Sequence, residues 1–470
     1  MKKVIYSLLA GVLMLASCSD FTDIPQKGKN LLSSTDDLEL LLNKEYDMWN
    51  TDMRTISGVL YNYSSIPAVI AQPNKTRTSI MYGYFDDESS LVRFEQLTTA
   101  DSYYADLYGN IGKVSNPILQ QVESATGPEE KKKALKAEAL TLRAYDHFLL
   151  LQKYAKAYNA ATAANDPAII YLTEDVDIQV IQERKTVQEA YELCLKDIDE
   201  AIALNAMPET AVTPLRFNKA ATYAVKAHIC LAMQKYADAI AAAKQALALN
   251  SNLYDYWGNV IHTMNWYGDE YDYSTPTVTE NPEVYFGMPN NVYYSWVNPN
   301  LVSMMEPTYA TYFLFTRMDD GADYGIPGWE EGFDFDNYVN DSGLDVGNMY
   351  LLIAEAAIKN GDINMAMENL DILRKSRISP ETYTTLKGNV TSKAEAIKAL
   401  KADYIAENIW TWWNFIGMKR WNVDNDWKIT LSQTIGDKTY TLSPESQLWI
   451  FPFPANVTGK NPNITWNKMK

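Results

Sequence analysis

Residues that commonly build metal sites and nucleophilic active sites are scarce in this sequence. Its 470 residues include only 3 histidines and 3 cysteines. No histidine has a second histidine or a cysteine at the spacing of metal ligands. The sequence also has no Gly-x-Ser-x-Gly elbow, no phosphate-binding glycine loop and no His-Glu-x-x-His helix. These absences argue against several classes of enzyme, and we expect no catalytic residue, no metal and no cofactor.

Two possibilities for chemistry stay open in spite of these absences. A glycosidase needs only two carboxylates, and 59 acidic residues guarantee chance pairs such as Asp334 with Asp336 or Glu330 with Glu331. The acidic run at positions 319–323 has some calcium-binding character but lacks the rest of an EF-hand loop. A solvated loop is the simpler interpretation of both features.

Basic residues are outnumbered by acidic ones. Lys and Arg total 41 against 59 Asp and Glu, which gives a net charge of −18. A nucleic-acid interface needs a basic face for the phosphates, and a polybasic attachment to anionic lipid needs the same. The composition therefore predicts an acidic, solvated surface and no nucleic-acid partner.

Long apolar runs are absent after the first 17 residues. Lys2 and Lys3 precede an apolar run at positions 4–16, which is too short to span a bilayer and is typical of the core of a signal peptide. Leu-Ala-Ser then precedes Cys18, which resembles a bacterial lipoprotein box, in which the cysteine receives diacylglycerol. We expect a signal peptide at 1–17, a lipid anchor on Cys18 and one domain over 18–470. An ordinary secretory signal that contains a cysteine is the alternative.

Two stretches of the chain predict helical hairpins of the same kind. Positions 218–252 indicate two helices joined by a turn at Gln234-Lys235, and 349–377 repeats the pattern with its turn at Gly361. Small and matching residues fall on the facing sides of both units: Tyr223, Ala227, Cys230, Ala239, Ala243 and Ala246 in the first, and Tyr350, Ala354 and Ala366 in the second. Such self-similarity is typical of tetratricopeptide-like repeats.

The rest of the chain divides into helical segments and aromatic-rich loops. The predicted fold is mainly α, a scaffold of tetratricopeptide-like helical hairpins with long irregular loops and a few short strands. Helical repeats are expected at about 101–158, 186–252 and 346–415, and the last of them ends in one helix over 393–415. The helix that follows Thr186 is predicted to start with a capping box of Thr186 and Glu189, and a further helix from about Leu38 to Trp49 is predicted to be capped by Asp36 and Asp37. Short strands are predicted at 169–172, 283–286 and 292–296. The loop regions are 50–98 and 253–345, and the proline-containing C-terminal stretch is expected to wrap the surface.

The remaining cysteines and the histidines fit a structural role best. Cys194 and Cys230 each lie on an apolar helix face and are most simply buried small hydrophobic residues, although a disulfide stays possible. His147 and His228 lie within predicted helices, and His262 is alone in a loop. None of them indicates a ligand site.

The order of these segments resembles the SusD/RagB family of outer-membrane nutrient-binding lipoproteins of Bacteroidetes. The matching pieces run nearly end to end and are the lipoprotein box at Cys18, YADLYGNIGKVSNPILQQV, ALKAEALTLRAYDHFLLLQKYA, ERKTVQEAYELCLKDIDEAI, the hairpin at 218–252, NPEVYF, YLLIAEAAIKNGDINMAMENLDILRKSR and LWIFPFPANVTGKNPNITWN. The chain departs from the family where Glu407 precedes Asn408 instead of an arginine, where Lys419-Arg420-Trp421 stands for Gly-Arg-Trp, and where an Asp-Arg signature is missing around MDDGADYG. It is therefore similar to a divergent member.

The resemblance implies a function without catalysis. Such proteins sit by a lipid anchor on the extracellular side of the outer membrane, cap a SusC-like TonB-dependent transporter and deliver oligosaccharide to it. We therefore expect a non-enzymatic glycan-binding protein with that transporter, the oligosaccharide and the outer membrane as its partners. A peptide-binding or protein-binding tetratricopeptide-like scaffold is the alternative, followed by a helical glycoside hydrolase.

Aromatic residues in the loops are the candidates for glycan binding. The chain has 32 Tyr and 12 Trp, and flat aromatic faces suit the C–H faces of sugar rings while planar polar groups suit the hydroxyls. The candidates are Asn74, Arg77, Tyr82, Tyr84, Trp257, Asn265, Trp266, Tyr267, Asp269, Trp296 and Trp329. Each of them has a structural alternative, since loop aromatics also pack beneath long insertions or form protein interfaces.

Overall fold

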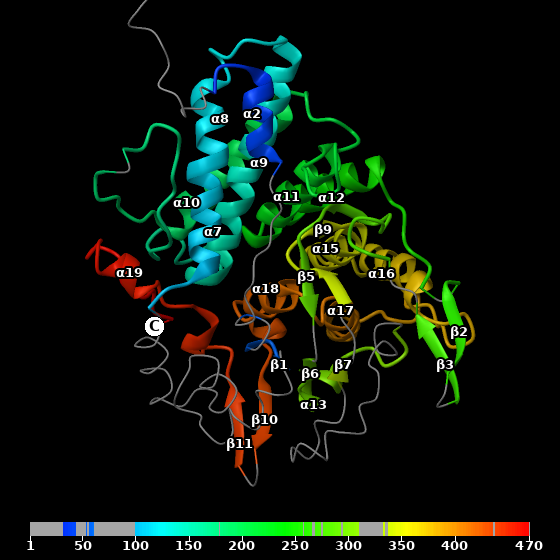
Figure 1. Ribbon diagram of the computed structural model, residues 1–470. Helices are drawn as coiled ribbons and strands as arrows, with labels where there is room; N and C mark the ends of the chain where they lie inside the picture. The colour runs from blue at the N-terminus through cyan, green and yellow to red at the C-terminus, as the bar shows by residue number, and fades with distance from the viewer. Residues whose placement is uncertain are drawn as a thin grey trace, which may run out of the picture.

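The structure is a computed structural model. It describes residues 32–43, 53, 56–60, 99–177, 179–256, 258–265, 268–273, 276–292, 295–309, 332–333, 337–435 and 438–469. The fold is mainly α, as predicted, and Figure 1 shows the helices above a set of small sheets. The expected signal peptide and Cys18 lie outside the described residues. No helix in the described ranges is both long enough and apolar enough to cross a membrane.

The N-terminal helices pack as a layer on one long helix. Helix α2 (Thr35–Leu42) begins three residues before the predicted start because Ser34, not Asp36, is its N-cap and forms a capping box with Asp37. The predicted continuation of α2 to Trp49 lies outside the described residues. Helix α7 (Ser102–Asn110), the π-helix η1 (Ile111–Ser115) and α8 (Asn116–Gln121) then run against α9 (Glu129–Tyr154).

Five of the predicted helices begin and end close to the expected positions. Helix α10 (Val187–Ala203) starts with the predicted capping box of Thr186 and Glu189. The predicted hairpin at 218–252 is confirmed as α11 (Lys219–Ala232) and α12 (Tyr236–Leu249). Its predicted repeat is confirmed as α15 (Val346–Lys359) and α16 (Ile363–Arg377).

The two hairpins share one turn geometry. Gln234 has φ +61° and Gly361 has φ +84°, so both turns pass through the left-handed region. The N–H of Lys235 donates to the carbonyl of Cys230 at 2.9 Å, and the N–H of Asp362 donates to the carbonyl of Ala357 at 2.8 Å. Each turn is therefore a Schellman motif. The alignment of Gln234 with Gly361 made from the sequence is confirmed.

The last predicted helix, 393–415, is wrong as one element. The structure has α17 (Lys393–Glu407) and α18 (Trp412–Trp421), which are separated by a turn at 408–411. Asn408 caps α17, its carbonyl accepts a hydrogen bond from the N–H of Thr411, and Thr411 is the N-cap of α18. The break comes from these polar side chains, without a proline or glycine to signal it.

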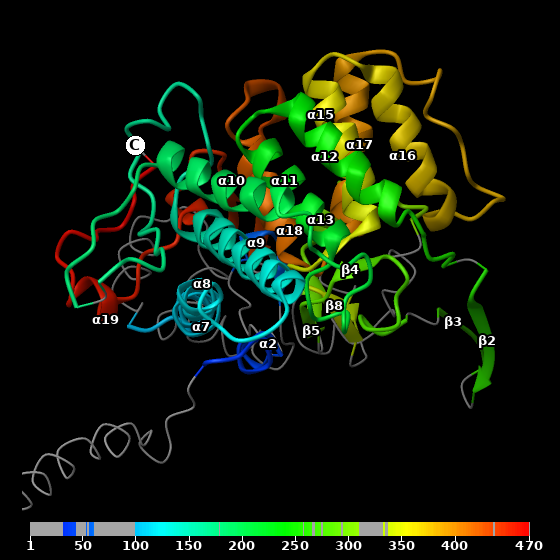
Figure 2. The same ribbon diagram turned by 90° about the horizontal axis from the view of Figure 1, so that it is seen from above.

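The helices follow one another across the molecule in chain order. Helix α9 packs on α10, α10 on α11, α11 on α12, α12 on α15, α15 on α16 and α16 on α17. Figure 2 shows this succession from above, with α9 to α11 on one side and α15 to α17 on the other. The first helix of each repeated hairpin is the more buried one, since residues 227–232 of α11 and 346–358 of α15 are all buried.

The strands are short and antiparallel. Their bounds are β1 (Val59–Leu60), β2 (Val260–Asn265), β3 (Gly268–Tyr273), β4 (Val284–Phe286), β5 (Pro289–Val292), β6 (Ser295–Val297), β7 (Gly332–Phe333), β8 (Asn337–Asn340), β9 (Leu344–Asp345), β10 (Leu431–Ile435) and β11 (Lys438–Leu442). The pairs are β1–β6–β7, β2–β3, β4–β9, β5–β8 and β10–β11. The predicted strand at 283–286 is β4, the prediction at 292–296 falls on the end of β5 and the start of β6, and 169–172 forms no strand.

The C-terminal stretch contradicts the expectation that it wraps the surface. It contains only the short turns η4 (Gln447–Trp449) and α19 (Ala455–Thr458), yet Leu448, Trp449, Ile450 and Phe451 are fully buried. The N–H of Phe451 donates to the carbonyl of Lys153 in α9 at 2.9 Å. Proline excludes a helix here but does not exclude burial, so the segment closes the core.

Candidate functional site

A small sheet joins the two loop regions that the sequence marks as ligand-binding. Strand β1, from the first region, pairs with β6 of the second, and β6 pairs with β7. Trp296 lies in the central strand, opposite Leu60 on one side and Gly332 on the other. Segments that are more than 200 positions apart in the sequence therefore meet at Trp296 (Figure 1).

The turn before β1 fixes this junction. Gly58 has φ +99°, and a Cβ placed there would lie 3.2 Å from Cδ2 of Leu301 in the short helix α13 (Pro299–Val302). The N–H of Asn298 donates to the carbonyl of Gly58 at 2.8 Å, and its Nδ2 donates to the carbonyl of Ser432 in β10 at 2.6 Å. Glycine is required at position 58 because the backbone is left-handed and the neighbouring chain is close.

The structure locates only some of the candidate binding residues. Trp296 lies in β6, Asp269 lies in β3 opposite Met264, and Asn265 ends β2 opposite Gly268. The other candidates lie outside the described residues: Asn74, Arg77, Tyr82, Tyr84, Trp257, Trp266, Tyr267 and Trp329. The hairpin of β2 and β3 stands apart from β6 in Figure 1, so Trp296, in β6, is the described candidate where the two loop regions pair.

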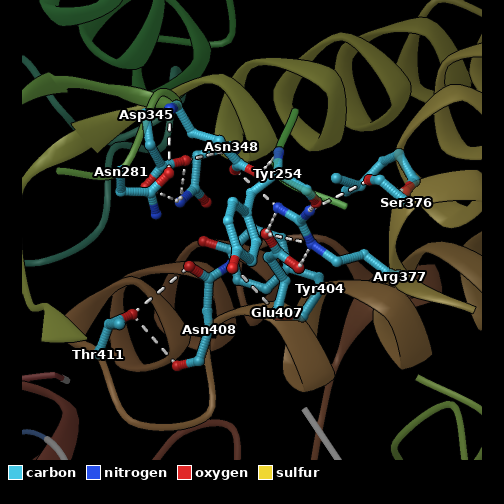
Figure 3. Close-up of polar contacts among 12 residues, drawn as sticks. Tyr254, Asn281, Asp345, Asn348, Ser376, Arg377, Tyr404, Glu407, Asn408 and Thr411 are labelled. Carbon is cyan, nitrogen blue, oxygen red and sulfur yellow. Dashed lines mark hydrogen bonds and ion pairs between the residues drawn. The ribbon is translucent and has the colours of Figure 1, made fainter. Parts of the chain in front are cut away.

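A buried arginine on α16 ties the second loop region to the helices. Arg377 is 2% exposed, and its Nη2 lies 2.7 Å from carboxylate oxygens of both Glu283, beside β4, and Glu407, at the end of α17. Its Nη1 donates to the carbonyl of Tyr254 at 3.2 Å, and its guanidinium carbon lies 4.8 Å from the ring centre of Tyr256. Figure 3 shows Arg377 between Tyr254 and Glu407.

Electrostatics around Arg377 favour a charged guanidinium. Burial alone lowers the pKa of Arg377, but Glu283 and Glu407 raise it well above its ordinary value. Asp345 is the N-cap of α15 and accepts a hydrogen bond from the N–H of Asn348 at 2.8 Å (Figure 3). Burial raises the pKa of Asp345 to about 7 because no basic partner offsets the loss of solvent, and the nearby charges of Glu283 and Glu407 add to this rise.

Arg374, one turn before Arg377 on α16, contacts the same loop region at Glu306. Nη1 of Arg374 lies 2.7 Å from Oδ1 of Asp403 in α17 and 3.2 Å from Oε2 of Glu306. Burial raises the pKa of Asp403 to about 7, although Arg374 opposes the rise. Arg374 and Arg377 together anchor the loop region at residues 254, 283 and 306. Neither arginine was predicted as a functional residue, and the signal in the sequence is a pair of arginines one turn apart at the end of a predicted helix.

The histidines and cysteines serve packing in the described structure. His147 stacks on Tyr171 with ring centres 3.7 Å apart, and His228 stacks on Trp413 with ring centres 4.1 Å apart. Burial lowers the pKa of each histidine to about 3. Cys194 and Cys230 are free and buried. Among the described residues no three His, Cys, Asp or Glu side chains gather as a metal site, and positions 319–323 lie outside those residues.

Comparison with known protein families finds a match over part of the chain. Residues 48–231 match the family model SusD-like_3, described as starch-binding and associating with the outer membrane. No curated protein sequence matches the chain.

Several solved structures share the fold over nearly the full length. A SusD-like carbohydrate binding protein from Bacteroides vulgatus is 16% identical, with a TM-score of 0.62 over 93% of this chain and 98% of that one. A SusD superfamily protein from Bacteroides thetaiotaomicron is 15% identical, with a TM-score of 0.60 over 92% and 99%. One from Bacteroides fragilis is 16% identical, with a TM-score of 0.62 over 92% and 97%. The family model thus matches the chain over residues 48–231, and the chain shares the fold of these SusD-like structures over most of its length.

Proposed function

We propose that this protein binds oligosaccharide at the junction of its two aromatic loop regions, around Trp296. The observation that carries the proposal is the sheet β1–β6–β7, because it joins regions 50–98 and 253–345 in a fold shared with carbohydrate-binding proteins. A glycan bound beside this sheet would then contact aromatic residues of both regions. A rigid frame lowers the entropic cost of holding several rings against a glycan.

We also propose where the protein is held and which partner receives the glycan. A lipid on Cys18 would hold the protein at the outer membrane, in keeping with the description of the matching family. From there it would pass the glycan to a SusC-like TonB-dependent transporter. Co-purification of the two proteins from membranes, with a Cys18→Ala variant released from the membrane, is the expected result.

Binding without catalysis is part of the same proposal. Among the described acidic residues, burial raises the pKa of Glu138, Glu283, Asp345 and Asp403. A glycosidase needs such a carboxyl group beside the scissile bond. Glu138, Glu283 and Asp403 are at most 5% exposed and are held by arginines, while Asp345 is half-buried and caps α15. This agrees with a family of binding proteins rather than enzymes.

A peptide-binding scaffold is less well supported. A tetratricopeptide groove must be open, but here the inner helices of both hairpins are covered. Phe286 of β4 stacks on Phe217, before α11, with ring centres 3.9 Å apart, and Trp413 of α18 stacks on His228 of α11. Nε1 of Trp413 also donates to the carbonyl of Gly343 at 2.8 Å. The face of α11 that meets β4 and α18 is therefore closed to a peptide.

The test is oligosaccharide binding by glycan array followed by calorimetry. We expect Trp296→Ala to weaken binding of the selected glycan at least tenfold, because stacking on one ring is lost. The matched control is Tyr223→Ala, which removes a partly exposed ring from α11 in the scaffold. Cleavage of the glycan, or equal effects of both substitutions, would contradict the proposal.

A further inference from the structure

A cavity of about 270 Å³ lies beyond the C-terminal end of α9. It is lined by the segment after α9, by the end of α18 and by parts of the C-terminal stretch, and its charged and amide side chains are Lys156, Asp166, Lys419, Asn422, Lys428 and Glu445. None of these residues belongs to regions 50–98 or 253–345. Its volume falls just below the ~300 Å³ at which pockets for drug-sized ligands begin. The cavity therefore suits one sugar ring rather than a chain.

The charges around the cavity do not balance. Lys156 lies 2.8 Å from Asp166, and Lys428 lies 2.6 Å from Glu445, so each acidic residue is paired with its own lysine. Lys419 is the third lysine and has no carboxylate within ion-pair distance in the described structure. In a chain with a net charge of −18, this cavity carries an excess positive charge whenever Lys419 is protonated.

Lys419 is buried and only partly satisfied. It is 3% exposed, and its Nζ donates to the carbonyls of Gln152 and Ala155 at 2.5 and 2.6 Å. These are carbonyls at the C-terminal end of α9, a favourable place for a cation. An ammonium has three N–H donors, these carbonyls accept from two of them, and the ring centre of Phe415 lies 5.7 Å from Nζ, so the third donor makes no hydrogen bond within the described ranges. Burial lowers the pKa of Lys419 to about 7, and an anion in the cavity would favour its charged form.

A second donor beside Lys419 is also unused. Asn422 follows one turn later, and its Oδ1 accepts a hydrogen bond from the N–H of Ile429 at 2.9 Å. Its Nδ2 is buried and has no hydrogen-bond partner within the described ranges. A buried amide donor without a partner is costly, so a ligand acceptor at this position would stabilise the site.

The remaining lining indicates what kind of anion fits. Ala157, Val423, Pro444 and Met469 offer apolar surface, while Asn159 and Thr162 offer polar groups. An inorganic anion gains nothing from contact with the apolar side chains. A sugar ring can pack its C–H faces on them and can form hydrogen bonds between its hydroxyls and the side chains of Asn159 and Thr162. We propose that this cavity is a second binding site, which takes a single sugar unit that carries a carboxylate, held by Lys419 and Asn422.

The test uses calorimetric titration of the full protein with methyl glucuronide, methyl glucoside and inorganic phosphate. The expected result is that methyl glucuronide binds and that the neutral glucoside binds at least tenfold more weakly. Equal binding of the two glycosides would overturn the role of the carboxylate. Phosphate binding as tight as that of methyl glucuronide would overturn the assignment to a sugar.

The decisive variant is Asn422→Asp. The new carboxylate keeps the oxygen that accepts from Ile429 but replaces the free donor with a negative charge beside Lys419. We expect methyl glucuronide affinity to fall at least tenfold, while Asn389→Asp, on an exposed loop outside the cavity, leaves it unchanged. Unchanged affinity in Asn422→Asp would overturn the proposal.

A surface variant guards against a folding defect in Asn422→Asp. Lys428→Gln removes a partly exposed positive charge from the mouth of the cavity, and Lys226→Gln removes one from a comparable ion pair on α11. We expect Lys428→Gln to lower methyl glucuronide affinity two- to fivefold and Lys226→Gln to leave it unchanged. An equal loss of affinity in both variants would overturn the proposed site. Binding of neutral oligosaccharide, which tests the junction at Trp296 separately, should persist in all four variants.

Discussion

The two repeated hairpins share a turn but differ in what they bury. The hairpin α11–α12 packs through alanines, with Ala227, Ala239 and Ala243 fully buried. The hairpin α15–α16 has the equivalent alanines but also buries Glu355, Arg374 and Arg377. Those charged groups reach α18, Glu306 and Glu283 respectively. The hairpin α11–α12 packs on neighbouring helices, whereas α15–α16 also forms ion pairs with Glu283 and Glu306 of the loop region 253–345.

This difference shows which parts of the sequence determine the packing of each hairpin. Small residues let helices approach closely, and that information is local to the hairpin. Buried ion pairs depend on groups far away in the sequence, and each is costly when one partner is missing. We therefore expect substitutions in the two hairpins to fail in different ways.

The largest effect is expected from breaking the ionic anchor. Arg377→Met leaves Glu283 and Glu407 without a buried partner and should lower the free energy of unfolding by about 3–5 kcal/mol. Denaturant unfolding measures this loss. Lys375→Met, two residues earlier on an exposed face, is the control and should stay within about 0.5 kcal/mol of the wild type. A loss below 1 kcal/mol for Arg377→Met would show that the anchor is dispensable.

Crowding the alanine interface should cost less. Ala243→Leu forces extra volume between α12 and its neighbours, and we expect a loss of about 1–3 kcal/mol in the free energy of unfolding. Ala237→Leu adds the same atoms on the exposed side of α12 and should be nearly neutral. If the two variants unfold at the same denaturant concentration, the close packing of this hairpin is not what stabilises it.

The pH dependence of stability distinguishes the second hairpin further. The pKa of Asp345 is about 7 in the folded protein and ~3.9 when unfolded, so the folded state binds more protons between these values. Its contribution to stability is present at about pH 4 and is lost as the pH rises to about 7, with a slope of at most ~1.4 kcal/mol per pH unit.

Asp345→Asn should remove that contribution while keeping a good N-cap for α15. The wild type is then expected to lose more stability than the variant when urea unfolding is compared at pH 4.5 and pH 7. Asp403 retains its own contribution in both proteins. Parallel losses in the two proteins would mean that Asp345 ionises normally.

The smallest effect is expected at the shared turns. Gly361→Ala places a side chain at φ +84° and should lower the free energy of unfolding by about 1 kcal/mol, while Gln234→Gly relieves a side chain at φ +61° and should raise it by up to about 1 kcal/mol. Thermal melting followed by circular dichroism checks both. Shifts of the same sign would contradict the equivalence of the turns.

Much of the scaffold was predictable because its signals are local. The capping box at Thr186, the turn at Gln234 and the alanine faces all lie within a few residues of the elements that they specify. The break between α17 and α18 was missed because Asn408 and Thr411 are weak signals. The burial of Trp449 and Phe451 was missed because it depends on contact with α9, about 300 positions earlier in the sequence.

The candidate site was predictable only in outline. An aromatic-rich loop region is visible in composition, but the pairing of Leu60 with Trp296 depends on the folded sheet. The same holds for Arg377, whose partners Glu283 and Glu407 come from different elements. Sequence spacing cannot bring such residues together, so the individual binding residues stay predictions.

The central claim is that the helices hold the loops and that the junction of the loops binds glycan. Calorimetric titration of an array-selected oligosaccharide into the wild type and Trp296→Ala, with unfolding measured on the same samples, tests it most directly. We predict at least a tenfold loss of affinity with a change in the free energy of unfolding below about 1 kcal/mol. Unchanged affinity in Trp296→Ala would contradict the account.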